Sequence, residues 1–293
     1  MSSLREIKDR IGSVRSTLKI TNAMKLVASA KLRKAQQTIE GLHPYEATLA
    51  SILSYVRAAS PGVTAAEKKE SGGGKTAVVV VASNSSLCGG FNANVVRKAL
   101  EVIYECEGGA DVYAVGRKAA DALRREGFPA PELLAGSGLN PENLVAHTDY
   151  EEAVRFAQLL IDAYESGVYD RVLLVYSHFV STSRQDVLCE TYLPFDAQAV
   201  QGGEGLSEDG TADIILEPGP EAIAESLMPL VMRLKIYTVL LDSVASEHAA
   251  RTIAMQTASD NAKDILDELT LEYNKGRQQQ ITAELLDIVG GSQ

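Results

Sequence analysis

Two segments at opposite ends of the chain carry apolar residues at alternating steps of three and four positions. The first spans residues 3–59, where Thr21 and Lys25 interrupt the pattern, and the last begins after Pro220. Such spacing, kept over many turns, is typical of a coiled-coil seam. We therefore expect two long terminal helices that pair with each other. The seam positions are Leu4, Ile7, Ile11, Val14, Leu18, Ala28, Leu32, Ala35, Ile39 and Leu42 in the first segment, and Ile223, Leu227, Leu230, Leu234, Tyr237, Leu241, Val244, His248, Met255, Ala258, Ala262, Ile265, Leu269 and Tyr273 in the last.

The last helix is predicted to be much longer than an ordinary helix. No proline follows Pro229, so the helix can continue almost to Gly290. Its roughly 70 residues would span about 105 Å, whereas a globular helix averages about 11–12 residues. A helix of this length needs a partner, which the first segment can supply. Within that first segment, Gly41 and Pro44 are expected to bend or fray the helix.

Charge and length indicate how the two helices pair. The first helix begins with basic residues, and the later part of the last helix is acidic, which favours an antiparallel pair. With the inner ends aligned near Ala59 and Glu221, the last helix overhangs by about ten to fifteen residues. This overhang, residues 279–291, exposes apolar side chains that are not stable in water without a covering partner. The apolar residues of the overhang are Ile281, Leu285, Leu286, Ile288 and Val289.

Between the two helical segments, strand-like and helix-like patterns alternate. This order predicts a small Rossmann-like α/β domain with a mostly parallel sheet, so the fold class is α/β with a long antiparallel coiled coil. The expected domains are residues 1–60, 75–198 and 220–293, with a flexible acidic linker at 199–219. The expected strands are Thr76–Ser83, Asp111–Val115, Arg171–Val180 and Val187–Leu193, and the expected helices are Ala93–Glu105, Arg117–Arg125 and Tyr150–Glu165.

Composition excludes several classes of protein. A net charge of −11 argues against a dedicated nucleic-acid binder. The three cysteines lie far apart in sequence, which gives neither a disulfide framework nor a zinc motif. The first residues, MSSLREIKDR, do not have the pattern of a signal peptide. The longest apolar run, Ala77–Ala82, is too short to cross a bilayer.

A glycine-rich stretch, residues 71–76, resembles half of a phosphate-binding loop. Gly74-Lys75-Thr76 matches the end of the motif G-x-x-x-x-G-K-[ST], but its first glycine would fall at Lys69. The order is also reversed, because the following apolar run indicates a strand and the motif requires a helix. The plainer interpretation is a flexible linker that enters a strand, with a P-loop-like NTPase as the minor alternative.

The stretch SNSSLCGGFN, residues 83–92, lies between a predicted strand and a predicted helix, where α/β enzymes often carry their sites. Cys88 could act as a nucleophile, and the glycines could hold an anion. However, no histidine or acidic residue lies nearby in sequence, and the motif G-x-S-x-G is absent. A tight turn with a buried cysteine is the plainer interpretation. The four histidines show no H-E-x-x-H spacing, so we expect no catalytic, cofactor or metal site.

Several motifs together resemble the gamma subunit of the F-type ATP synthase. LKITNAMKLVASAKLRKAQQ, residues 18–37, is similar to the first helix of that family, and SLCGGFN, residues 86–92, is similar to its central turn. YDRVLLVYSHFVST, residues 169–182, resembles a later strand. SEHAARTIAMQTASDNAKDIL and YNKGRQQQITAELLDIVGG resemble the last helix, so the resemblance covers nearly the whole chain.

The sequence departs from the family pattern at a few positions. Asn84, Ser85 and Ser86 stand where the family usually has an acid, a base and a glycine, so the resemblance does not imply the family's charged contact at that turn for this chain. Gly276 stands where the family prefers alanine, and it should destabilise the helix by roughly 0.5–1 kcal/mol. Gly290-Gly291 replaces the usual Gly-Ala.

The resemblance implies a non-catalytic rotor shaft. Its paired helices would thread a hexamer of alpha and beta subunits, and its α/β domain would join the epsilon subunit and the c-ring. The chain would be peripheral to the cytoplasmic face of the bacterial inner membrane. A coiled-coil adaptor or scaffold is the alternative interpretation. The residues implied as contacts with the hexamer are Met24, Lys25, Arg251, Arg277, Gln278, Ile281, Thr282, Glu284, Leu285 and Ile288.

Overall fold

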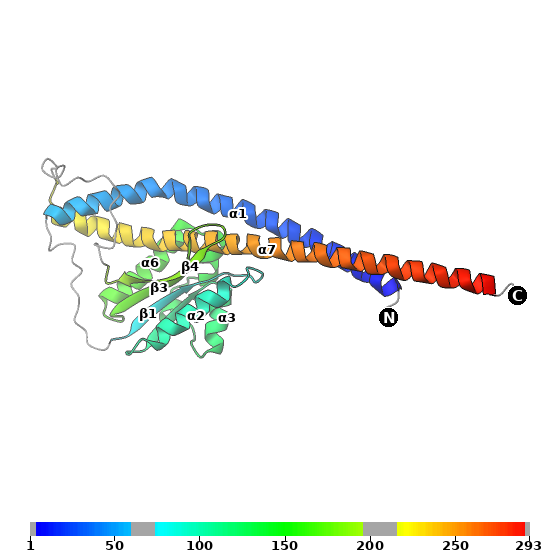
Figure 1. Ribbon diagram of the computed structural model, residues 1–293. Helices are drawn as coiled ribbons and strands as arrows, with labels where there is room; N and C mark the ends of the chain where they lie inside the picture. The colour runs from blue at the N-terminus through cyan, green and yellow to red at the C-terminus, as the bar shows by residue number, and fades with distance from the viewer. Residues whose placement is uncertain (1–3, 60–73, 196–215, 291–293) are drawn as a thin grey trace. The chain divides into compact units, whose positions relative to one another are not determined.

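The computed structural model describes residues 4–59, 74–195 and 216–290. The acidic loop 199–213 noted in the sequence lies outside these residues. Figure 1 labels the elements within the described ranges. In chain order they are α1 (Leu4–Ala59), β1 (Thr76–Val81), α2 (Phe91–Tyr104), β2 (Ala110–Val115), α3 (Arg117–Arg125), α4 (Glu132–Gly136), α5 (Pro141–His147), α6 (Tyr150–Glu165), β3 (Arg171–Phe179), β4 (Gln185–Leu193) and α7 (Pro220–Gly290).

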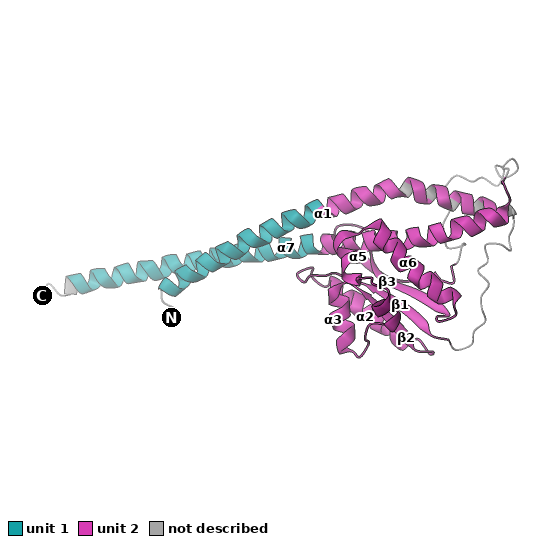
Figure 2. Ribbon diagram, turned by 180° about the vertical axis from the view of Figure 1, so that it is seen from behind, with its two compact units in different colours: residues 1–30, 251–293 teal, residues 31–250 magenta. Residues whose placement is uncertain are grey.

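The chain divides into two compact units, coloured separately in Figure 2. Unit 1 comprises residues 1–30 and 251–293, and unit 2 comprises residues 31–250. The divisions fall inside α1 and α7, so each long helix contributes one part to each unit. The expected fold class, long N- and C-terminal helices with a central α/β sheet, is confirmed.

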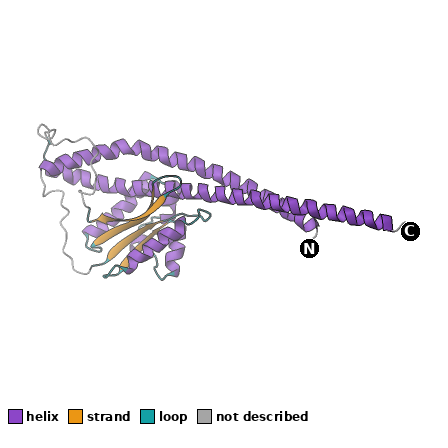
Figure 3. Cartoon of the chain, viewed as in Figure 1, coloured by secondary structure: helices purple, strands orange, loops and turns teal. Residues whose placement is uncertain are grey.

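Unit 2 is built on a four-stranded sheet in the order β2-β1-β3-β4. Strand β1 runs parallel to both of its neighbours, and the edge strand β4 runs antiparallel to β3. Val79 at the centre of β1 lies opposite Tyr113 of β2 and Leu174 of β3. The mostly parallel sheet expected from the sequence is therefore confirmed, and helices lie on both of its faces (Figure 3).

The all-apolar sequence of β1 is explained by burial on both faces of the sheet. Ala77, Val79 and Val81 belong to one core cluster, whereas Val78 and Val80 belong to the other. Successive side chains of a strand point to opposite faces, so a strand covered on both sides has no position for a polar residue. The cluster with Val78 and Val80 packs under α2 and α3, and the cluster with Ala77, Val79 and Val81 packs under α6 and α7.

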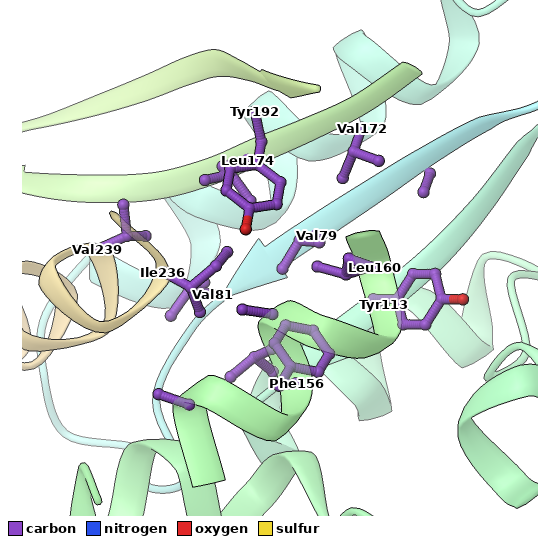
Figure 4. Packing of buried hydrophobic residues seen from close by; sticks show 14 of the residues in the cluster. Val79, Val81, Tyr113, Phe156, Leu160, Val172, Leu174, Tyr192, Ile236 and Val239 are labelled. Carbon is purple, nitrogen blue, oxygen red and sulfur yellow. The ribbon is translucent and has the colours of Figure 1, made fainter. Parts of the chain in front are cut away.

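The cluster under α6 and α7 makes α7 a structural part of the α/β domain. Ile236 and Val239 of α7 pack with Phe156 of α6 and Leu174 of β3 (Figure 4), and Leu240 of α7 belongs to the same cluster. All five side chains are almost completely buried. Because burial of a large aliphatic side chain contributes about 1.5–3 kcal/mol, these contacts hold the middle of α7 firmly on the sheet.

Within unit 2, α1 pairs with α7 in an antiparallel manner. Leu32 and Ala35 pack with Ala245 and Ala249, and farther along the pair Thr238 donates a hydrogen bond to Glu46. Helix α1 continues unbroken through Gly41 and Pro44, so the fraying expected there does not occur. Packing against a neighbouring helix can hold a proline in place, although the proline supplies no hydrogen bond to the preceding turn.

Two short helices, α4 and α5, were not expected from the sequence. Helix α5 begins with proline, and Asn140 caps it by accepting a hydrogen bond from the amide of Glu142. Helices α3 and α6 have the expected bounds, and Asp149 caps α6 in the same way through Glu151. Strand β1 ends at Val81, two residues before the expected end at Ser83.

Candidate functional site

Unit 1 consists of two antiparallel helices, and it contains all ten residues proposed as contacts. Leu4 of α1 lies against Gly276 of α7, Thr21 lies against Ser259, and Lys25 lies against Gln256. As residue numbers rise along α1, those of the partners fall along α7. The antiparallel pairing expected from charge is therefore confirmed within this unit.

The seam of unit 1 follows the expected α7 positions at Met255, Ala262 and Leu269 and departs from the expected set elsewhere. Ile265 is exposed, and Leu266 is partly buried in its place. Ser259 is fully buried next to the expected but only partly buried Ala258. The buried positions of α7 in unit 1 are Arg251, Met255, Ser259, Ala262 and Leu269.

A buried hydroxyl pair joins the two helices at the centre of unit 1. Ser259 Oγ donates to Thr21 Oγ1 at 2.8 Å, and Thr21 Oγ1 donates to the carbonyl oxygen of Leu18 at 3.1 Å. A buried polar group without its partner costs about 1–3 kcal/mol, so sliding the helices past each other is penalised. Polar residues at seam positions are known to fix the register of coiled coils, and this pair has the geometry for that role.

Lys25 belongs to a polar chain on the flank of the same seam. Its ammonium donates to Gln256 Oε1 at 2.8 Å, and Gln256 Nε2 donates to Asp260 at 2.7 Å. Lys263 also donates to Asp260, at 3.2 Å. The hydrogen bond from Gln256, together with that from Lys263, holds the pKa of Asp260 below its ordinary value. In this chain Lys25 therefore binds α7, the helix that pairs with its own, through Gln256.

The remaining contact candidates fall into two groups by exposure. Met24 is partly buried, and Arg251 is only 8% exposed. The candidates from Arg277 onwards are all exposed, and Thr282 donates to the carbonyl oxygen of Gln278 one turn earlier in the helix. Seven of the ten candidates are thus brought together on the last four turns of α7, namely Arg277, Gln278, Ile281, Thr282, Glu284, Leu285 and Ile288.

These last turns form a single helix with an apolar surface. Since Leu4 contacts Gly276, residues 277–290 extend beyond the described part of α1, as Figure 2 shows. Leu285 is 58% exposed and Ile288 is 69% exposed, and all described side chains from 277 to 288 are exposed. We call residues 277–288 the α7 tip. It has the form of a surface that another molecule must cover.

Comparisons with known proteins identify the family. The family model described as ATP synthase matches residues 3–293. The ATP synthase gamma chain of Bacteroides thetaiotaomicron is 45% identical over 308 residues, covering 100% of this chain and 99% of the relative. The gamma chain of Bacteroides fragilis is 47% identical over 297 residues, with the same coverage. The chain belongs to the ATP synthase gamma-chain family.

A chain in one solved ATP synthase structure has a similar fold. The central stalk and c-ring structure of the Tetrahymena thermophila mitochondrial ATP synthase contains a similar chain, with 26% identity and a TM-score of 0.53. The match covers 82% of this chain and 99% of that one. The family membership inferred from the motifs is thereby confirmed, and the central-shaft function implied by it is supported.

In this gamma-chain family member, the turn that carries Cys88 is a structural one. Cys88 is buried, and Asn92 Nδ2 donates to its sulfur at 3.1 Å. Asn92 also accepts from the amide of Ser83, while Asn84 receives a hydrogen bond from the amide of Arg117. These bonds fasten the turn to the starts of α2 and α3, and the cysteine is buried in it, as the plainer interpretation predicted.

Other candidate chemistry is also explained by packing in this gamma-chain family member. Thr76 begins β1, and Lys75 forms an ion pair with Asp111 at 2.7 Å, so the Gly-Lys-Thr stretch leads into a strand. Among the described residues, no cluster of three or more potential metal ligands is found. Within the same residues, no helix is long and apolar enough to span a membrane.

Proposed function

We propose that this chain is the central rotor shaft of an F-type ATP synthase. It carries torque from the proton-driven c-ring to the catalytic hexamer of alpha and beta subunits, and it also binds the epsilon subunit. The chain is a non-catalytic subunit. It is peripheral to the membrane, at the cytoplasmic face of the bacterial inner membrane.

The apolar tip of α7 is the observation that carries this proposal. Leu285, Leu286 and Ile288 are each more than half exposed on a helix that no other described segment covers. Such a surface is unfavourable in water, so it needs an apolar sleeve of matching diameter. A ring of subunits with a central bore provides such a sleeve and allows the helix to turn inside it.

The proposal includes the residues that contact the hexamer. The exposed polar members of the tip, such as Arg277 and Gln278, would form hydrogen bonds with the surrounding subunits. Met24 and Lys25 would face them from the helix pair, where Lys25 also stabilises α7 through Gln256. The full set consists of Met24, Lys25, Arg251, Arg277, Gln278, Ile281, Thr282, Glu284, Leu285 and Ile288.

Purification of the tagged chain from membranes tests the proposal. The wild-type chain should bring down nucleotide-binding alpha and beta subunits in a complex that hydrolyses ATP. Replacing Ile281, Leu285 and Ile288 together by aspartate would bury unpaired carboxylates in the sleeve. Each costs several kcal/mol, so recovery of the subunits should fall by more than about tenfold.

A matched control removes no apolar surface from the tip. Gln279→Asp places one negative charge at an exposed polar position of the same stretch and should leave recovery unchanged. If the triple variant assembles and pumps protons like the wild type, the tip is not enclosed and the shaft proposal is wrong. If alpha and beta subunits are never recovered, the coiled-coil adaptor becomes the better interpretation.

The NTPase alternative is tested separately. The isolated chain should bind no labelled ATP, because Lys75 is paired with Asp111 and its neighbour Thr76 is part of the sheet. Saturable ATP binding that is lost on Lys75→Ala would restore that alternative.

A further inference from the structure

One carboxylate of α7 binds two consecutive residues at the end of β3 in unit 2. Asp242 Oδ1 accepts a hydrogen bond from the amide of Phe179 at 2.7 Å, and Asp242 Oδ2 lies 2.5 Å from Nδ1 of His178. The Asp242 side chain is 14% exposed, and that of His178 is 47% exposed. Both oxygens of one side chain are thus engaged by two consecutive residues of the strand.

Two serines on the same face of α7 bind neighbouring strand ends. Ser246 Oγ donates to the carbonyl oxygen of Ser177 at 2.9 Å, and Ser243 Oγ donates to that of Val81 at 3.4 Å. Ser177, Ser243 and Ser246 are all fully buried. Positions 242, 243 and 246 lie within one helical turn, so one patch of α7 contacts the ends of both central strands.

Phe179 extends this contact to the helix pair of unit 2. Its side chain packs against the cluster formed by Leu32 and Ala35 of α1 with Ala245 and Ala249 of α7. The same strand end therefore contacts both helices. We call Ser177, His178, Phe179, Asp242, Ser243 and Ser246 the β3–α7 joint.

The joint differs in kind from the apolar and ionic contacts between α7 and the sheet, and its carboxylate bonds are stronger than the neutral hydrogen bond that Tyr192 of β4 donates to the carbonyl oxygen of Met232 at 3.1 Å. The apolar contacts of Ile236, Val239 and Leu240 are strong but non-directional, and they tolerate a small rotation of the helix. The ion pair between Lys235 and Glu190 is partly exposed on both sides, where such pairs contribute little. Hydrogen bonds to a largely buried carboxylate have fixed lengths and angles and are about twice as strong as neutral ones.

We propose that Asp242 is a positioning residue that prevents α7 from turning about its own axis relative to the sheet, so that torque passes between the α/β domain and the helix pair through the β3–α7 joint. This inference rests on the proposed function, because only a rotating shaft loads the joint in torsion. Apolar burial holds the helix against the sheet, whereas the carboxylate sets the angle at which the helix is held.

Single-molecule rotation of the assembled hexamer with this chain provides the test. A bead is fixed to the α/β domain through Glu126→Cys, an exposed position beyond α3, with Cys106 and Cys189 replaced by serine so that labelling is specific. The angular fluctuation of the bead during ATP-waiting pauses measures the torsional stiffness between the domain and the hexamer. Hydrolysis without a bead measures the catalytic cycle alone.

Asp242→Ala removes two of the four polar contacts of the joint, so the torsional stiffness should fall by about twofold. The hydrolysis rate without a bead should be unchanged, because the hexamer does not contact this part of unit 2 in the proposed arrangement. His178→Ala removes one contact at a half-exposed position and should give a smaller loss. This second variant keeps the inference testable if Asp242→Ala fails to assemble.

Asp186→Ala is the matched control. It removes a carboxylate from the same hairpin, where Asp186 pairs with Arg184 at 2.8 Å and not with α7. Its stiffness should equal that of the wild type. Wild-type stiffness in an assembled Asp242→Ala complex, or in an assembled His178→Ala complex where the first does not form, would overturn the inference and leave the shaft proposal standing. A wild-type bead that never rotates would instead overturn the shaft proposal.

Discussion

Helix α7 is used in two different ways in the two units. In unit 2 its middle section completes the hydrophobic core of the α/β domain through residues such as Ile236 and Leu240. In unit 1 it pairs with one helix across a narrow seam that includes the hydroxyls of Thr21 and Ser259. The difference teaches that unit 2 is stabilised by its own buried area, whereas unit 1 depends on the register of its two helices and on a covering partner.

The largest effect is expected from loss of a core side chain that α7 supplies to unit 2. Leu240 is 1% exposed, so Leu240→Ala should lower the free energy of unfolding of unit 2 by about 2–5 kcal/mol. Leu271→Ala removes the same atoms from a side chain of unit 1 that is 73% exposed. It should change stability by less than about 0.5 kcal/mol.

Urea denaturation followed by circular dichroism checks this pair. Equal losses of unfolding free energy in the two variants would contradict the distinction between unit 2, stabilised by burial, and unit 1, stabilised by pairing.

A smaller effect is expected at the buried hydroxyl pair of unit 1. Thr21→Val leaves Ser259 Oγ without its acceptor and should cost about 1–3 kcal/mol. Combining Thr21→Val with Ser259→Ala removes both polar groups and should restore much of that loss. A double-mutant cycle of unfolding free energies measures the coupling, and purely additive costs would show that the pair does not set the register.

The smallest effect per residue is expected from alkaline pH acting on unit 2. Burial raises the pKa of Tyr169, Tyr176 and Tyr192, and Glu190 adds to the rise at Tyr176. The folded chain therefore holds these protons more tightly than the unfolded chain. The resulting stability is fully present below the unfolded pKa of about 10 and is lost as the pH rises above it.

Tyr176→Phe isolates one of these contributions. At neutral pH the variant should be less stable, because Glu190 loses the hydroxyl that donates to it at 3.0 Å. Above pH of about 10 its stability should decline less steeply than that of the wild type, so the two curves converge. Urea denaturation at a series of alkaline pH values gives both curves, and parallel curves would show that Tyr176 does not link unit 2 to pH.

Much of the fold could be predicted from the sequence because its signals are local and repeated. Helix α6 has an aspartate cap and a regular apolar face, and β1 is an uninterrupted apolar run. The short helices α4 and α5 were missed because 5 and 7 residues are too few to establish a helical period.

Part of the seam of unit 1 was misassigned for a different physical reason. A hydrophobic pattern selects Ala258 and Ile265, whereas the buried positions include Ser259. The hydroxyl of Ser259 donates to Thr21, which lies more than two hundred residues away in the sequence. The pairing of Asp242 with His178 is likewise a product of the folded chain and leaves no local signal. The apolar tip could be predicted, because its overhang follows from the unequal lengths of the two helices.

The absence of a side chain at Gly276 has a consequence for the other end of the chain. A β-carbon there would lie 2.9 Å from the Leu4 methyl carbon Cδ2, so glycine allows the first turn of α1 to rest directly on α7. Within the described residues, the paired part of the two helices therefore ends where the first turn of α1 meets Gly276. Removing the first turn of α1 would lengthen the unpaired part of α7 without altering any residue of the tip itself.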